Sequence, residues 1–160
     1  IIGVRSSSSL AGFLNYNLRM IFDRVVFVQT TSGSEIFEQL MDIGEDDVML
    51  AISFPRYSTR IVNAVEYAAQ AGAQVISITD SGNSPIARDA HAVLTARSDM
   101  ASFIDSLVAP LSIINALLAA VAQKKQAELS ATLSKLETVW DTFNVYDKNT
   151  AAAARKHSDE

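Results

Sequence analysis

The chain has 160 residues and a mass of 17.3 kDa, with 49% hydrophobic and 19% charged residues, which is enough for one folded domain with a substantial core. Thirteen basic against eighteen acidic residues give a formal net charge of -5, so the chain is a poor candidate for binding nucleic acid by itself, because such binding depends on basic surface. The absence of cysteine excludes disulfides, a thiol nucleophile and thiolate metal sites, and it fits a cytoplasmic protein.

The sequence begins directly in an apolar run, without methionine and without a signal peptide. We therefore expect a piece cut from a longer protein. A second apolar segment, at 107–121, is interrupted by Pro110, Ser112 and Asn115, so it falls short of a membrane span. We expect no membrane contact.

Apolar runs rich in β-branched residues predict five strands, at residues 1–4, 24–28, 48–52, 74–79 and 92–95. Helical spacing of apolar residues separates the first four of these runs. We expect these helices at 10–22, between Ser34 and Gly44, and from 61 to a stop at Gly72, with at most a short helix at 86–89.

From Met100 onward no strand pattern returns. Two long helices are predicted instead, at 103–123 and 129–143. The second carries its apolar residues on one stripe, formed by Leu129, Leu133, Leu136, Val139, Trp140 and Phe143. Small, polar and charged residues follow, so we expect the domain to occupy 1–146 and a flexible tail to occupy 147–160.

The alternation of strands and helices with short connections predicts an α/β fold, a doubly wound five-stranded parallel sheet with helices on both faces. Five strands favour the flavodoxin-like order 2-1-3-4-5, in which ligands bind where the order reverses, between strands 1 and 3. The loops that follow these two strands contain residues 5–9 and 53–59. We therefore expect the two loops to converge on one crevice.

Both loops are polar, and each precedes a predicted helix. In the first, Arg5 is followed by four serines; in the second, Arg56 lies among hydroxyl residues. Hydroxyls, arginines and free amides at a helix start suit an anion, above all phosphate. The alternative is a pair of ordinary βα turns, in which Ser58 or Thr59 and the first-loop serines only cap helices. The candidate ligand-binding residues are Arg5, Ser6, Ser7, Ser53, Arg56, Tyr57, Ser58 and Thr59.

Three stretches resemble the sugar isomerase (SIS) domain, in particular the effector domain of RpiR/MurR-type bacterial transcriptional regulators. Residues 3–11 resemble the first loop of that family, with its recurrent serine at Ser7. Residues 51–59 resemble the phosphate-cradling loop, usually Ser-x-Ser-Gly-x-Thr. Residues 72–80, with 84–87 and 89–94, resemble the segment from the fourth to the fifth strand. The resemblance implies a SIS fold over nearly the whole chain.

The chain departs from the family pattern at both loops. Pro55 and Arg56 stand at the second serine and the glycine of the second loop, and Ser58 takes the place of the threonine. Arg5 stands where the first loop usually has glycine. Proline removes an amide donor, whereas arginine adds a charged fork suited to phosphate or carboxylate. The expected ligand is a small anionic metabolite, either a sugar phosphate or a sugar acid.

The resemblance implies a regulatory domain rather than an enzyme. SIS enzymes need a positioned glutamate or histidine to move a proton. His91 opens the fifth predicted strand, His157 lies in the tail, and the glutamates lie on helices as solvated faces. No grouping has metal-ligand spacing, and neither Gly-rich nucleotide motif occurs. We expect no catalytic residue, no metal and no cofactor.

Regulators of this type carry a helix-turn-helix domain before the SIS domain, so the resemblance implies that DNA is contacted only through a missing N-terminal domain. Paired half-sites on DNA favour paired proteins, and the helices at 10–22 and 103–143 carry more apolar residues than one sheet needs. We therefore expect a homodimer or larger homo-oligomer. Two alternatives stay open: a phosphosugar isomerase completed by a partner subunit, and a non-catalytic assembly module.

Overall fold

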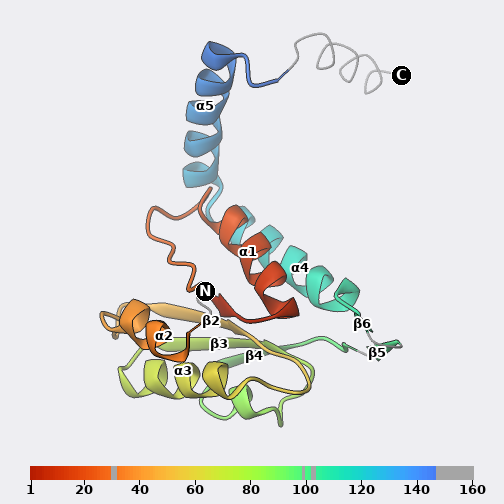
Figure 1. Cartoon of the computed structure of the whole chain (residues 1–160). Coiled ribbons are helices and arrows are strands. Elements are labelled where there is room, and N and C mark those ends of the chain that lie inside the picture. The colour runs from red at the N-terminus through yellow and green to blue at the C-terminus, as the bar shows by residue number, and fades with distance from the viewer. Residues whose placement is uncertain (30–31, 99, 102–103, 147–160) are drawn as a thin grey trace.

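A computed structural model describes residues 1–29, 32–98, 100–101 and 104–146 of the chain. Its centre is a four-stranded parallel sheet in the order β1-β2-β3-β4 (Figure 1). The strands are β1 (Ile2–Gly3), β2 (Val48–Ile52), β3 (Gln74–Thr79) and β4 (Ala92–Thr95). Neighbours in the sheet follow chain order, and every pair is parallel. The predicted α/β class and four of the five predicted strands are confirmed.

The strand predicted at 24–28 is wrong. Only Val28 pairs with the sheet, through an isolated parallel bridge to Ile2, where the Val28 N–H donates to the Ile1 carbonyl at 2.9 Å. Because Ile2 also pairs with Ala51, Val28 lies on the outer side of β1. This is the edge at which the predicted order 2-1-3-4-5 places the segment, but the observed sheet has four strands. β1 has two residues and offers almost no ladder to extend. Val26 is 62% exposed, whereas Val28 is buried in the core and Val25 and Phe27 pack against core residues, so the segment is held by side-chain packing rather than by a strand ladder.

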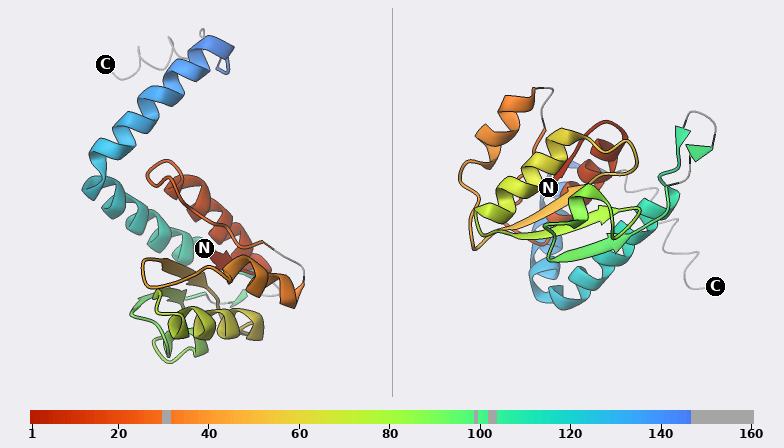
Figure 2. Two further views of the ribbon diagram at one scale, coloured as in Figure 1. Left: turned by 90° about the vertical axis from the view of Figure 1, so that its left-hand side faces the viewer. Right: turned by 90° about the horizontal axis from the view of Figure 1, so that it is seen from below.

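Helices cover both faces of the sheet (Figure 2). On one face lie α1 (Ser6–Leu18) and α4 (Val108–Lys124), which pack on each other and bury Leu14, Ile78 and Ile114. On the other face lie α2 (Gly33–Leu40), α3 (Thr59–Gln70) and the 3₁₀ turn η1 (Pro85–Ala87). β2 and β3 are apolar on both sides because each side of a parallel sheet is covered. The central strands β2 and β3 therefore face packed side chains on both sides, whereas no residue of the edge strand β4 is buried.

The end of α3 follows the predicted stop. Gly72 has φ +90, its N–H donates to the Ala69 carbonyl, and the Ala73 N–H donates to the Ala68 carbonyl. These are the two bonds that close a helix with a left-handed residue after its last turn, a conformation that glycine adopts without steric cost. β3 begins two residues later.

The region after β4 differs from the prediction. Instead of a helix beginning at 103, a short antiparallel pair occurs, β5 (Met100–Ala101) with β6 (Ile104–Asp105), and α4 begins at Val108. Pro110 explains the later start, because proline is tolerated only in the first turn of a helix, where its missing N–H would have no partner. The prediction that no strand follows Met100 is therefore wrong.

The last helix, α5 (Gln126–Phe143), projects from the body of the molecule (Figures 1 and 2). A bend at Lys125, with φ -114 and ψ 34, separates it from α4. No residue within 126–143 is buried. The predicted helix is confirmed, with a start three residues earlier, and the predicted tail at 147–160 lies outside the described residues.

Candidate functional site

Two loops meet at the carboxyl ends of β1 and β2. Gly3 and Ile52 are paired residues at the ends of these strands, so the segments that follow leave the sheet side by side. α1 begins against β1: a Cβ atom on Gly3 would lie 2.7 Å from the Ser7 carbonyl oxygen, so only glycine permits this approach. A pocket of about 90 Å³ lies between the loops. Its lining consists of Val4, Arg5, Ser6, Ser7, Ser53, Phe54, Pro55, Arg56, Ser58 and Asp105.

Six of the eight residues predicted for the ligand site line this pocket, namely Arg5, Ser6, Ser7, Ser53, Arg56 and Ser58. Ser7 and Ser53 are buried, with 6% and 5% of their surface exposed. Ser58 is the N-cap residue of α3, but its hydroxyl makes no capping bond, and its carbonyl accepts the amides of Ile61 and Val62 instead. α1 likewise starts without a side-chain cap. No capping side chain therefore competes with an anion for the first amides of either helix.

Both arginines of the pocket have backbone conformations that favour glycine. Arg5 has φ 56 and ψ -128, and Arg56 has φ 66. A residue with a Cβ atom in such a region costs about 1–3 kcal/mol. The fold thus holds both side chains at the pocket in spite of that cost. The Arg56 side chain is 67% exposed, so its guanidinium can be reached from solvent.

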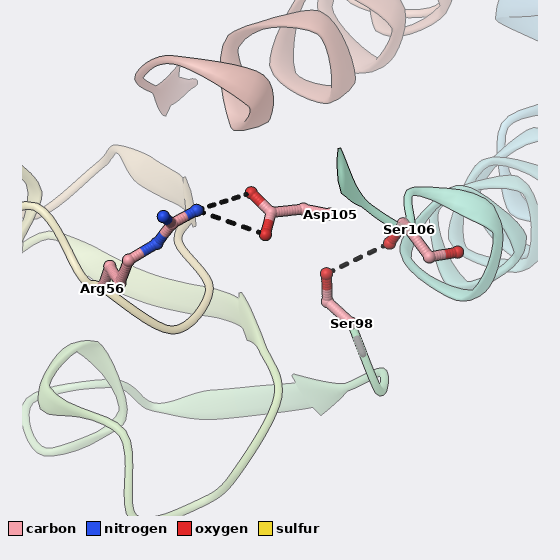
Figure 3. Close-up of polar contacts among 4 residues, drawn as sticks. All are labelled: Arg56, Ser98, Asp105 and Ser106. Atoms are coloured by element: carbon pink, nitrogen blue, oxygen red, sulfur yellow. Dashed lines mark hydrogen bonds and ion pairs between the residues drawn. The ribbon is translucent and has the colours of Figure 1, made fainter. Parts of the chain in front are cut away.

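Asp105 on β6 is the acidic residue of the pocket, and the sequence analysis did not include it. Its Oδ1 and Oδ2 lie 3.4 Å and 3.5 Å from Nη2 of Arg56 (Figure 3). Next to it, the Ser98 hydroxyl donates to the Ser106 carbonyl at 3.1 Å and joins the two ends of the β5–β6 segment (Figure 3). Asp105 is 49 residues from Arg56 in the sequence. Only the tertiary structure brings it to the site.

Tyr57 and Thr59 are not among the residues that line the pocket. Thr59 is the exposed first residue of α3. The Tyr57 hydroxyl donates to Asp80 Oδ1 at 2.7 Å, and the Thr79 hydroxyl donates to the same oxygen at 3.1 Å. This contact joins the loops after β2 and β3. Tyr57 therefore supports the second loop from outside the pocket.

The histidine of the described chain has a structural contact. His91 Nδ1 accepts the Val75 N–H at 3.1 Å, and the His91 N–H donates to the Val75 carbonyl at 2.8 Å, so the residue fixes the start of β4 beside β3. No group of three or more Asp, Glu or His residues that could hold a metal ion occurs in the described part of the chain. Among those same residues, no helix has the length and apolar character needed to cross a bilayer.

Comparison with known families agrees with the fold. The sequence pattern of the SIS domain matches residues 1–120, three quarters of the chain. The chain belongs to the SIS domain family. The match includes both loops, the sheet and most of α4, and it ends before α5.

The relatives of this SIS domain include transcriptional regulators. An uncharacterized HTH-type transcriptional regulator of Caldanaerobacter subterraneus subsp. tengcongensis is 31% identical over 136 residues, which are 81% of this chain and 48% of that protein. The chain thus spans about half the length of that relative. The sugar isomerase domain of an RpiR transcription factor from Sphaerobacter thermophilus has a TM-score of 0.76 at 28% identity, over 82% of this chain and 73% of the other.

A further structure shares the fold of this SIS domain. The Vibrio vulnificus NanR protein complexed with ManNAc-6P has a TM-score of 0.70 at 18% identity, over 88% of this chain and 54% of the other. With the Sphaerobacter domain and the Caldanaerobacter regulator, this chain resembles the sugar isomerase domain of RpiR-type transcriptional regulators.

The φ values bear on the two positions at which the sequence departs from the loops that it resembles. Arg5 and Arg56 stand where that resemblance leads one to expect glycine, and both have a positive φ. Glycine adopts such a conformation without steric cost, so each arginine adds a cationic side chain to its loop at a cost in backbone strain.

Tyr57 gives a pH-dependent prediction for this loop. Partial burial, followed by the hydrogen bond to Asp80 and its negative charge, raises the pKa of Tyr57 to about 12. Since the folded-state pKa is above the ordinary value of 10.0, the contact stabilises the fold fully below about pH 10 and its contribution is lost as the pH rises toward about 12. We expect Tyr57→Phe to lower the free energy of unfolding by about 1 kcal/mol at neutral pH.

Melting curves of the wild-type chain and Tyr57→Phe across this pH range test the expectation. The difference between their Tm values should shrink as the tyrosine ionises. A difference that stays constant up to the highest pH would show that the Asp80 contact does not set the ionisation of Tyr57.

Proposed function

We propose that this SIS domain senses a small anionic metabolite, a sugar phosphate or a sugar acid, bound in the pocket between β1 and β2. The observation that carries the proposal is the convergence of two arginines, four serines and two uncapped helix starts on one pocket of about 90 Å³. Helix-start amides and arginines are groups that stabilise phosphate or carboxylate oxygens. The ligand named in the NanR structure, a sugar phosphate, supports the same ligand class for this chain.

The domain would act as the effector-binding part of a bacterial RpiR-type transcriptional regulator in the cytoplasm. The similarity to an HTH-type regulator over about half of that protein supports this role. DNA would then be contacted by a helix-turn-helix domain of the longer protein, which agrees with the net charge of -5 of this chain. Ligand binding would change operator binding through the arrangement of the paired domains.

A phosphosugar isomerase is the second candidate, and Asp105 is the observation in its favour. A carboxylate in the pocket could move a proton between the carbons of a sugar. In this structure, however, both oxygens of that carboxylate face the Arg56 guanidinium, and among the described residues that line the pocket there is no second acid or base to complete the proton transfer. Conversion of a bound sugar phosphate to its isomer, monitored by NMR, would identify an enzyme; we expect binding without conversion.

The third possibility is a non-catalytic assembly module, which would bind no ligand in this pocket.

A panel of phosphosugars and sugar acids tests the sensing function directly. A ligand that binds only the folded chain stabilises it by about 2.7 kcal/mol when its concentration is 100 times the Kd. We therefore expect at least one member of the panel to raise the Tm by several degrees, in a dose-dependent way. Sodium chloride at matched ionic strength is the control. If no member of the panel shifts the Tm more than this control, the sensing function is wrong.

We also propose that the domain pairs with a second copy of itself through α5. In proteins most of the stability of a helix comes from the packing of its apolar face, and none of the α5 residues is buried in the single chain. Five of its apolar residues recur at alternating spacings of four and three, namely Leu129, Leu133, Leu136, Trp140 and Phe143. This spacing forms a seam that packs best against another helix of the same pattern.

A further inference from the structure

Asp105 differs in its chemistry from every other residue that lines the pocket. Arg5 and Arg56 can only donate hydrogen bonds, and the serine hydroxyls can donate or accept. Asp105 is an acceptor when ionised, and among the described residues that line the pocket it is the one acid. Its side chain is 27% exposed, so part of it faces the solvent-filled space. The pocket therefore has a donor-rich side and an acceptor.

The pair between Arg56 and Asp105 leaves room for a ligand. Both carboxylate oxygens face the same nitrogen, Nη2, at 3.4 Å and 3.5 Å, whereas a strong charge-assisted bond is about 2.7–2.9 Å long. This is a loose contact to one nitrogen rather than a bidentate fork. A carboxylate has about four acceptor positions, so Asp105 can accept further hydrogen bonds while Arg56 balances its charge. The remaining N–H groups of Arg56 stay available to an anion.

We propose that Asp105 determines specificity for a hydroxylated anion by accepting hydrogen bonds from the ligand's hydroxyl groups. Arg5, Arg56 and the helix starts would hold the phosphate or carboxylate of the same ligand. This assignment rests on the proposed sensing function and adds to it the residue that distinguishes a sugar derivative from a simple anion. A site built to bind a hydroxyl discriminates strongly against an analogue that lacks it, because the acceptor in the site is then left unpaired.

A matched pair of ligands isolates this role. Glycerol 3-phosphate and n-propyl phosphate have the same three-carbon chain and the same phosphate, and differ only in their hydroxyls. Ribose 5-phosphate extends the hydroxylated series. The wild-type chain should bind the hydroxylated ligands about 10- to 100-fold more tightly than n-propyl phosphate, the range expected for hydrogen bonds to a charged group. Titration calorimetry or NMR chemical-shift titration measures each Kd.

Asp105→Asn keeps the size of the side chain and removes its charge. In this variant the preference for glycerol 3-phosphate over n-propyl phosphate should fall about tenfold, while the affinity for n-propyl phosphate stays equal or improves. The matched control is Asp46→Asn, which makes the same charge change at an exposed position before β2, at the opposite end of that strand from the pocket. It should leave every Kd unchanged. Tm values without ligand show whether both variants are folded.

The outcomes separate this assignment from the proposed function. Equal tightening of both ligands in Asp105→Asn would show that Asp105 only competes with the anion for Arg56, and an unchanged preference would show that it takes no part; either result overturns the assignment and leaves anion binding intact. A wild-type chain that binds the two phosphates equally also overturns it. A wild-type chain that binds none of the three phosphates also overturns this assignment, whereas the sensing function is overturned only if no member of the full panel of phosphosugars and sugar acids binds.

Discussion

Replacement of Arg56 by glycine is expected to weaken the binding of an anionic ligand about 10- to 100-fold, because each charge-assisted hydrogen bond contributes roughly 1.5–3 kcal/mol. Arg56 lines the pocket, and 67% of its side-chain surface is exposed. Its one described ion pair, with Asp105, is long. The guanidinium can therefore turn toward a ligand at little cost.

The same substitution should leave the fold at least as stable. Arg56 has φ 66, a conformation that costs a residue with a Cβ atom about 1–2 kcal/mol and costs glycine almost nothing. The ion pair that is lost is solvent-exposed and contributes about 0–1 kcal/mol. Arg56→Ala keeps the Cβ atom and should be less stable than Arg56→Gly by about 1 kcal/mol. Both variants should lose affinity to the same extent.

Calorimetric titration and melting curves of the two variants measure both effects. Ser58→Ala, which removes a neutral hydroxyl from the pocket lining, should weaken binding only by about 1 kcal/mol. Arg88→Ala is the matched charge control, since Arg88 lies after η1 with an ordinary helical φ of -58. If Arg56→Gly bound the ligand as tightly as the wild type, the loop after β2 would have no role in binding the anion.

The central fold could be predicted from the sequence because its signals are local. The three runs at 48–52, 74–79 and 92–95 are continuous β-rich segments with helical periodicity between them, and all three are strands with the predicted bounds. The run at 24–28 has a similar composition but no ladder to join, since β1 ends after two residues. Composition indicates a preference for extended backbone, whereas strand formation also needs a partner of sufficient length.

The candidate site could be predicted only in part, for a related reason. The order of the strands places the loops after β1 and β2 side by side, so the six pocket residues of these loops follow from topology. Asp105 comes from a short antiparallel pair that no periodic pattern indicates, because β5 and β6 have two residues each. Pro110 is the one feature of the sequence that points to this pair. Because proline is tolerated only in the first turn of a helix, it places the start of α4 close to 108, so the residues before it cannot belong to that helix.

Disruption of the proposed pairing through α5 is expected to have the other large effect. Two exposed residues of its seam, Leu133 at 40% and Phe143 at 74%, contribute nothing to the core of the single chain. Their replacement by lysine should therefore leave the α/β body folded. In a dimer formed through α5, each buried apolar side chain contributes about 1.5–3 kcal/mol. The double variant Leu133→Lys/Phe143→Lys should weaken the dimer at least about 100-fold.

A matched variant separates the seam from the added charge. Ser134 and Thr138 lie on the opposite face of α5, one helical turn apart, where the Thr138 hydroxyl donates to the Ser134 carbonyl at 3.0 Å. Ser134→Lys/Thr138→Lys adds the same two charges away from the seam and should leave the association unchanged. Sedimentation velocity at tens of micromolar, on the order suited to a modest interface, should show dimers for the wild type and this control, and monomers for the seam variant. A wild-type chain that sediments as a clean monomer at this concentration would rule out pairing through α5, and equal dissociation of both variants would assign the loss to charge rather than to the apolar seam.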